Sequence, residues 1–356
     1  MEAIFFPRND YPNNVEVCAH RLGKKMTYTE DTDGLHTESS YIPFVSIAKE
    51  RNIKVSIFSG AKISGTTEDI VKNDYLNEKI WLDIYSLTPN IADKVTNHEQ
   101  ISKEEWDAAY DYIYTNFYEF TGKKPVALSY AYNNTTFKDY TTQFLGGRKS
   151  GHTGNTTNYG VGFGNPDDVP YSFSEFCCKE SSINWYDTAK LYHDSDFRYV
   201  LDNIVSPLID QTKINGGWLN NFTHWHHYYR DGNEQWAEAY LDLLASKNEN
   251  NDIYFAGYGE AIAYLVYRQI ISKVAMYTPV QKSDTLIIQI ETKNTLNVDT
   301  DLLQIPISIK FSTANTPLEN EEIESKQNLI NLGNNEYIVE IPYSEYPRSI
   351  ITKKYL

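Results

Sequence analysis

The sequence contains few cysteines, no long apolar run and no segment that resembles a secretory leader at its N-terminus. Its three cysteines, Cys18, Cys177 and Cys178, are odd in number and include an adjacent pair, so they form neither a disulfide framework nor zinc-ligand spacing. No stretch reaches the roughly 18 apolar residues that a membrane-spanning helix needs. The N-terminus lacks the charged segment and apolar run of a secretory signal. We therefore expect a soluble chain without membrane insertion.

Basic residues are also scarce. Lys and Arg total 32 against 48 Asp and Glu, which gives a net charge of −16 at pH 7. Such a surface repels phosphate backbones and anionic lipid, so we expect no nucleic-acid partner. Neutral sugars are not repelled, and the 29 tyrosines and 6 tryptophans supply rings that can stack on sugar faces. The same rings also suit buried cores, so both interpretations stay open.

The first three quarters of the chain alternate strand and helix signals. A strand at 26–29 leads through an acidic turn into a helix at about 38–51 and a strand at 53–57, which predicts neighbouring parallel strands. The helix at about 102–121 begins at a capping box, Ser102 with Glu105, and ends before Gly122. Residues 133–184 are predicted to form long loops with short strands. Further elements are expected as strands at 126–130, 217–223 and 252–256 and helices at about 197–211, 234–246 and 259–275.

The character of the sequence changes after Pro279. Short β runs at 286–290, 305–311, 337–341 and 349–352 are separated by Asn, Asp, Gly and Pro turns. We predict an α/β domain over residues 1–278 and a small Ig-like β-sandwich over residues 283–356.

Three segments, taken in order, share their pattern with one known family. The first is Thr27–Gly34 with its acidic turn, followed by the strand at Ile53–Phe58; the second is Ile101–Tyr132; the third is Trp218–His224 with Asp252–Tyr264. In this order the segments resemble the polysaccharide deacetylase (NodB-homology, carbohydrate esterase family 4-like) family. The resemblance implies a distorted (β/α)7 barrel and hydrolysis of N- or O-acetyl groups on polysaccharides with zinc or another divalent metal.

The resemblance also assigns candidate site residues. Asp33 matches the metal-binding carboxylate, and Asp31 takes the position of the general base if the match shifts by one residue. His224 matches the general acid. Tyr132 matches the tyrosine of the family's Arg-x-Pro-Tyr motif, and we predict glycan contacts for Tyr132 and Trp225.

The expected metal-binding histidine pair is missing. The segment in its place is Tyr85–Pro89, and no histidine occurs between His36 and His98. Ser129 stands where the family has its motif arginine. Because metal affinity depends on a full ligand set, Asp33 alone is a weak metal candidate and we expect no cofactor, with zinc or another divalent metal only if the protein is active.

Two clusters keep alternative interpretations. His224, His226 and His227 predict either a new metal site with Asp31, Asp33 or His36, or one histidine in a cleft and two on its rim, if the segment is a strand in which 224 and 226 share a side. The acidic run Glu30–Asp33 predicts either a ligand-facing site at a strand end or a solvated, helix-capping turn.

The sequence therefore leaves enzyme status open among three functions. The first is a polysaccharide-deacetylase-like pseudoenzyme that binds glycan or serves as a structural or assembly module, such as a virion or extracellular surface protein, with protein partners bound through the C-terminal β-domain. The second is an active metal-dependent polysaccharide deacetylase with a rearranged site. The third is a glycosidase-like enzyme that uses paired carboxylates on the same barrel.

Overall fold

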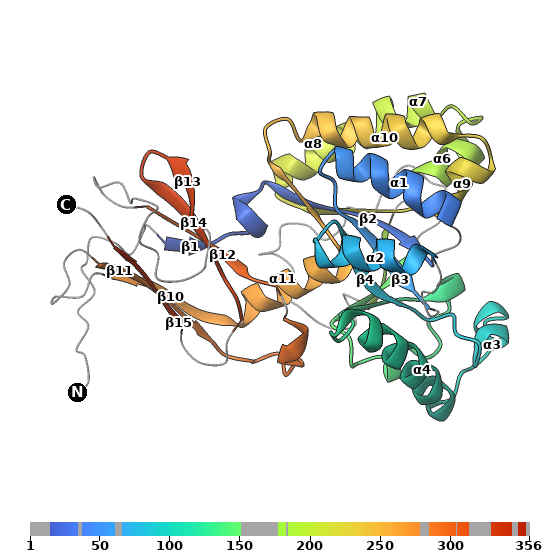
Figure 1. The fold of residues 1–356 in the computed structure, drawn as a ribbon, viewed down its shortest axis with the longest axis horizontal. Helices are drawn as coiled ribbons and strands as arrows, with labels where there is room; N and C mark the ends of the chain where they lie inside the picture. Colours follow the sequence, from blue (N-terminus) through green and yellow to red (C-terminus); the bar gives the residue numbers. More distant parts are fainter. Residues whose placement is uncertain are drawn as a thin grey trace. The chain divides into compact units, whose positions relative to one another are not determined.

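The computed structural model describes residues 15–34, 38–60, 66–150, 177–182, 184–277, 285–303, 305–312, 329–343 and 348–353. The chain divides into two compact units (Figure 1). The larger unit is Lys25–Ala263, and the smaller unit combines Met1–Lys24 with Tyr264–Leu356. In the described part of the chain, no helix is long and apolar enough to cross a membrane.

The larger unit is built on one parallel sheet, which confirms the predicted α/β class. The strand order is β7-β6-β5-β4-β3-β2-β8, and β9 also pairs with β2. All described neighbours run parallel. The strands are β2 (Met26–Asp33), β3 (Val55–Ser59), β4 (Ile80–Tyr85), β5 (Ala127–Ser129), β6 (Gly146–Ser150), β7 (Cys177–Ser182), β8 (Trp218–Phe222) and β9 (Ile253–Ala256).

Helices follow the strands, as the alternating sequence pattern predicted. Helix α4 begins at the predicted capping box, in which the Ser102 hydroxyl accepts from Glu105 N–H, and ends at Gly122 with a left-handed φ of 70°. The helices are α1 (Glu38–Glu50), α2 (Thr66–Leu76), α3 (Ala92–Thr96), α4 (Lys103–Thr121), α6 (Trp185–Tyr192), α7 (Phe197–Val200), a π-helical turn (Leu201–Val205), α8 (Ser206–Asn215), α9 (His226–Arg230), α10 (Glu234–Lys247) and α11 (Tyr258–Ile270).

The sheet is strongly curled, and its two faces carry different side chains. Arg148 on β6 reaches Asp31 on β2, although three strands separate β6 from β2 in the sheet order. Only a curled sheet can bring these side chains together across its concave face. Alternate residues point to the other face, where apolar side chains such as Ile57, Leu82 and Leu219 belong to the main hydrophobic core.

The smaller unit contains two antiparallel sheets. One has the order β1-β12-β14-β13 and the other β10-β11-β15. An ion pair joins Arg21 Nε to Glu340 Oε1 at 2.5 Å beside the first sheet. The strands are β1 (Val15–Val17), β10 (Ile271–Tyr277), β11 (Thr285–Thr292), β12 (Ile307–Ser312), β13 (Leu329–Gly333), β14 (Glu336–Ile341) and β15 (Arg348–Lys353).

Two features of the smaller unit were not predicted. The helix expected to run to residue 275 ends at Ile270, and β10 follows at once because Ile271–Tyr277 pairs with β11. Strand β1 pairs with β12, so Val15–Val17 belongs to the smaller unit, whereas the sequence analysis placed it in the α/β domain. Both differences depend on strand partners that are distant in the sequence, which local periodicity does not report.

Candidate functional site

Strand β2 places three carboxylates in the interior of the larger unit. All eight of its residues are buried, including Glu30, Asp31 and Asp33. Because side chains alternate along a strand, Asp31 and Asp33 share the concave face and Glu30 points to the opposite face. The predicted solvated acidic turn is therefore wrong for these three residues, which lie within the strand and are at most 5% exposed.

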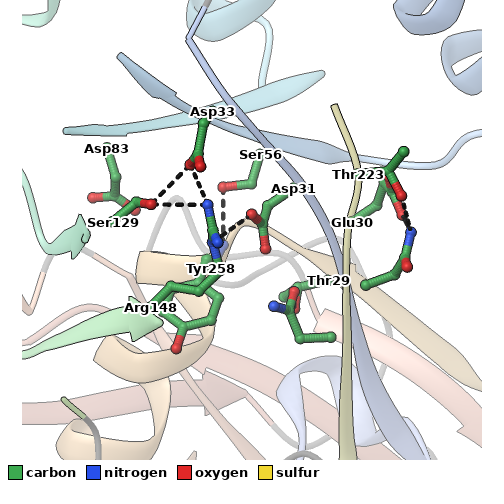
Figure 2. A network of polar contacts seen from close by, with 12 residues as sticks. Thr29, Glu30, Asp31, Asp33, Ser56, Asp83, Ser129, Arg148, Thr223 and Tyr258 are labelled. Carbon is green, nitrogen blue, oxygen red and sulfur yellow. Dashed lines mark hydrogen bonds and ion pairs between the residues drawn. The ribbon is translucent and has the colours of Figure 1, made fainter. Parts of the chain in front are cut away.

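On the concave face, a guanidinium group joins the two aspartates (Figure 2). Arg148 Nε lies 2.7 Å from Asp31 Oδ1, and Arg148 Nη2 donates to Asp33 Oδ1. Ser129 on β5 completes the cluster: its hydroxyl donates to Asp33 Oδ1 at 2.8 Å and accepts from Arg148 Nη2 at 2.8 Å. We call these four residues the arginine clamp. The clamp ties β2, β5 and β6 together across the curl of the sheet.

Aromatic rings hold the guanidinium in place. The Arg148 guanidinium carbon lies 3.9 Å from the centre of the Phe222 ring and 5.2 Å from that of Phe58. A planar cation stacked on a ring in a desolvated site gains cation–π energy as well as packing. Arg148 is among the largest fully buried side chains. Its position is therefore fixed by two aromatic rings as well as by its anionic partners.

The charges within the clamp oppose the cost of burial. Burial raises the pKa of Asp31 to about 7, although the Arg148 charge acts to lower it and the Asp33 charge raises it further. For Arg148, burial acts to lower the pKa, but the two aspartates outweigh it and the net pKa is raised. Arg148 therefore stays protonated, and the clamp contains a permanent buried cation.

Glu30 belongs to a separate network on the opposite face of β2. Its carboxylate accepts from Tyr240 Oη and Asn221 Nδ2, both at 2.6 Å, and from Trp225 Nε1 at 3.1 Å. Tyr240 Oη also lies 2.6 Å from Tyr28 Oη. These partners are neutral donors, and burial raises the pKa of Glu30 to about 8 in spite of them. The Glu30 network therefore retains a proton near neutral pH, whereas the arginine clamp contains a guanidinium cation.

Asp83 is a further buried acid of the larger unit. Asp83 on β4 accepts backbone N–H groups of Val126, Ala127 and Gly259 and the indole N–H of Trp81. Burial raises its pKa to about 7. A β-carbon at Gly259 would lie 2.3 Å from Asp83 Oδ2, so only glycine fits there. Asp83 therefore joins the first turn of α11 to strand β4 and stabilises the fold at this point.

Two tyrosines lie at or just after the C-terminal ends of β4 and β5, at the rim of the concave face. Tyr85 lies opposite Ser129 in the β4–β5 register, and the charges that act on its hydroxyl include those of Asp33 and Arg148. Tyr132 is 54% exposed and has a left-handed φ of 51°. The preceding residue is anchored, because Ala131 N–H donates to Ser86 Oγ at 2.8 Å. An exposed aromatic ring on a constrained backbone next to a polar interior is typical of a ligand-binding surface.

The structure places the other predicted residues as follows. His224 is half-buried and its ring packs edge-on against Phe222 at 4.9 Å, next to the ring on which Arg148 stacks. Trp225 is 3% exposed, stacks on Phe44 at 4.4 Å and donates to Glu30, so its indole is engaged in the core. The predicted glycan contact of Trp225 has no accessible ring face in this structure.

The histidine run has a different backbone from the one expected. Strand β8 ends at Phe222 and helix α9 begins at His226, so His224 and His226 are not alternate residues of a strand. The three rings still gather, with centroids 4.4 to 5.4 Å apart. Among the described residues, no group of three His, Cys, Asp or Glu side chains is arranged to hold a metal ion. His36, which was considered as a further ligand, lies outside the described residues.

The residues around Asp33 do not fit the divalent metal that the family resemblance implies. A catalytic zinc site needs about three protein ligands with free lone pairs and an open position. Here one oxygen of Asp33 accepts from Ser129 and Arg148, and the Arg148 guanidinium is already ion-paired with both aspartates. No step through a bound metal is therefore derived for this site.

Comparisons with known proteins return a fold likeness at low identity. No family model and no curated protein matches this sequence. Similar solved structures include a Pseudomonas aeruginosa protein named as a probable polysaccharide deacetylase (13% identity, 74% of this chain, 99% of that chain, TM-score 0.49). They also include the peptidoglycan deacetylase PdaC from Bacillus subtilis (9% identity, 69% and 93%, TM-score 0.41) and a family 4 carbohydrate esterase from Streptomyces lividans (10% identity, 65% and 91%, TM-score 0.38). These neighbours belong to the family that the three sequence segments resemble.

Sequence reasoning missed the central residue of the site. Arg148 follows two glycines in a stretch assigned to loops, and no periodicity marks β6 as a strand. One indirect signal existed: carboxylates expected inside a barrel with no metal-binding histidines need a buried cation as a partner. That signal gives the charge of the missing partner and not its position in the chain.

Proposed function

We propose that this chain is a polysaccharide-deacetylase-like protein that binds glycan or serves as a structural module and does not carry out metal-dependent hydrolysis. The observation that carries the proposal is the arginine clamp. Asp31 and Asp33, the residues matched to base and metal ligand, are ion-paired to a buried arginine. A carboxylate held in that way is neither a free base nor a free ligand.

A neutral glycan is the ligand that the rim of the concave face favours. Tyr132 offers an exposed ring, Tyr85 a phenol near Asp33, and His224 a half-buried imidazole. Sugar rings combine an apolar face with hydroxyl groups, which such amphipathic side chains match. The net charge of −16 disfavours polyanionic polymers.

The smaller unit has a separate place in this proposal. We propose that its two antiparallel sheets form a β-sandwich that attaches the protein to a structural partner, as on a virion or an extracellular surface. Two short sheets whose described residues include no group of three His, Cys, Asp or Glu side chains able to hold a metal ion suit attachment better than metal-dependent chemistry.

The alternative function is an active metal-dependent deacetylase with a rearranged site. It requires that Arg148 leave the aspartates and that histidines such as His224 join them. The three-histidine group beside Phe222 is the observation that favours this alternative. A glycosidase with paired carboxylates has less support, because Asp31 and Asp33 share a single guanidinium.

The test combines a metal measurement with two functional assays on the full chain. After zinc is offered and excess is removed, elemental mass spectrometry should find no bound metal, and acetate release from N-acetylated and O-acetylated glycans should stay at background. Affinity electrophoresis in gels containing neutral polysaccharides should show retardation that Tyr132→Ala abolishes. Chelator-sensitive acetate release would overturn the proposal, and His224→Ala would then identify the general acid.

A further inference from the structure

We propose that Arg148 is the built-in cation of this site, a side chain that takes the place of a divalent ion between Asp31 and Asp33. The inference deepens the proposed function and rests on it, because it assumes that Asp31 and Asp33 do not serve as the base and metal ligand of a hydrolase. It adds a specific claim: the oxygen cluster is a cation site, and the chain supplies its own cation.

The oxygen cluster has the composition of a site for a hard cation. Asp31 and Asp33 come from one strand face, and Ser129 Oγ from β5 lies 2.8 Å from Asp33 Oδ1. Two carboxylates and a hydroxyl are the ligands that ions such as Mn²⁺ prefer. In this structure, two different nitrogens of Arg148 reach the two carboxylates.

Aromatic rings and a hydroxyl group hold the Arg148 guanidinium in a fixed position. Phe222 and Phe58 pack on the cation, and Ser129 links it to Asp33 by a second route. Beneath it, Tyr258 Oη lies 3.5 Å from the carbonyl oxygen of Gly147, the residue before Arg148. Arg148 cannot leave this space without exposing two buried carboxylates to each other, so a second cation is excluded while it stays.

Removal of the arginine should therefore create a metal site. Arg148→Ala leaves two carboxylates, one hydroxyl and the vacated volume of a guanidinium group. Mn²⁺ is a suitable probe because free and bound ions are distinguished by electron paramagnetic resonance. We expect no binding to the unaltered protein and about one Mn²⁺ per chain in Arg148→Ala, with site occupancy requiring both aspartates.

Two variants serve as matched controls. Arg148→Lys keeps a positive charge, so it should bind no Mn²⁺. The triple variant Asp31→Asn/Asp33→Asn/Arg148→Ala removes all three charges, so it should also bind none. The triple variant additionally covers the case in which Arg148→Ala does not fold, because it should melt roughly 10 °C higher than the single variant if Arg148 serves as the counter-charge.

The outcomes separate this inference from the proposed function. Mn²⁺ binding to Arg148→Ala alone, and a triple variant more stable than the single variant, would support a built-in cation. Folded Arg148→Ala that binds no Mn²⁺, equal binding by the unaltered protein, or a triple variant no more stable than the single variant would overturn it. None of these results depends on glycan binding, which is measured separately by the Tyr132→Ala comparison.

Discussion

The two faces of strand β2 solve one physical problem in different ways. Glu30 and Asp31 are neighbours in sequence, and both are fully buried. Among the described residues, Glu30 accepts from the neutral donors Tyr240, Asn221 and Trp225, and burial raises its pKa to about 8. Asp31 contacts the Arg148 guanidinium and shares it with Asp33. On one face the buried acid is held by neutral donors and retains a proton near neutral pH, and on the other face two acids share one cation.

This difference teaches how a polar interior can persist without a bound ion. An isolated charge in a low-dielectric interior costs far more than one hydrogen bond returns, so each acid must find either a proton or a counter-charge. A proton leaves as the pH rises, whereas an arginine does not lose its charge. The Glu30 network should therefore respond to pH, and the clamp should respond to loss of its arginine.

The largest expected effect comes from removing the cation. Arg148→Gln should lower the free energy of unfolding by about 3–5 kcal/mol, because it leaves two buried carboxylates without a counter-charge. Glu30→Gln should cost only about 1–2 kcal/mol, because the amide disturbs hydrogen bonds but leaves no charge unpaired. Urea denaturation at pH 6 measures both. Equal losses in the two variants would contradict the distinction between the two faces.

The second prediction concerns pH. Burial raises the folded-state pKa of Glu30 from 4.5 to about 8 and that of Asp31 from 3.8 to about 7. Stability from these groups is fully present below their unfolded pKa values and is lost as pH rises through the folded values. The free energy of unfolding should fall between pH 7 and 8.5, mainly through Glu30, by about 1 kcal/mol or more.

Glu30→Gln is the control for this pH prediction. The variant removes the titrating group, so its free energy of unfolding should be flatter over pH 7 to 8.5 than that of the unaltered protein. Parallel pH profiles for the two proteins would show that Glu30 does not titrate in this window.

The third prediction tests the hydroxyl chain around Glu30. Tyr240→Phe removes the hydroxyl that donates to Glu30 Oε2 and should cost about 1 kcal/mol. Tyr130→Phe removes a comparable buried hydroxyl, 2.6 Å from Thr141 Oγ1, and is the matched control. Only Tyr240→Phe should change the pH dependence, because it removes a donor that stabilises the ionised form of Glu30. Thermal melts at pH 6 and 8.5 distinguish the two variants.

The smallest expected effect on stability is at Tyr132. Its side chain is 54% exposed, and its backbone has a φ of 51°, which glycine adopts without strain. Tyr132→Gly should change the free energy of unfolding by less than about 1 kcal/mol. Glycan retardation in affinity gels should nevertheless be lost. Retained retardation, with unchanged stability, would remove Tyr132 from the binding surface.

Much of the α/β architecture could be predicted from local signals. The capping box at Ser102 and Glu105 and the glycine at 122 gave the limits of α4, because capping is a local interaction. The order of strands and helices along the chain gave the parallel sheet. The end of α11 at Ile270 was not predictable in this way, because β10 exists through its pairing with β11.

The site was predictable only in part. Asp31 and Asp33 were chosen from the family resemblance and were expected in a turn after residue 29, whereas the structure extends β2 to Asp33 and places both on one face of that strand. Tyr132 was predicted to contact glycan, and its side chain is 54% exposed, so the contact stays a prediction. Trp225 was predicted as a ligand contact, but Phe44 and Glu30 occupy its ring and its N–H. Those partners are 181 and 195 residues away, beyond any local pattern.

The sequence by itself determined part of the strand and helix order of the larger unit, the capping of α4 and the loss of the family's histidine pair, because each depends on residue identity and short-range spacing. The tertiary structure decided what those acids do. The curl of the sheet brings Arg148, which is 115 residues beyond Asp33, into contact with both aspartates. Trp225, which directly precedes α9, and Tyr240 on α10 place neutral donors against Glu30. Burial sets the cost of each charge, and burial is a property of the folded chain alone.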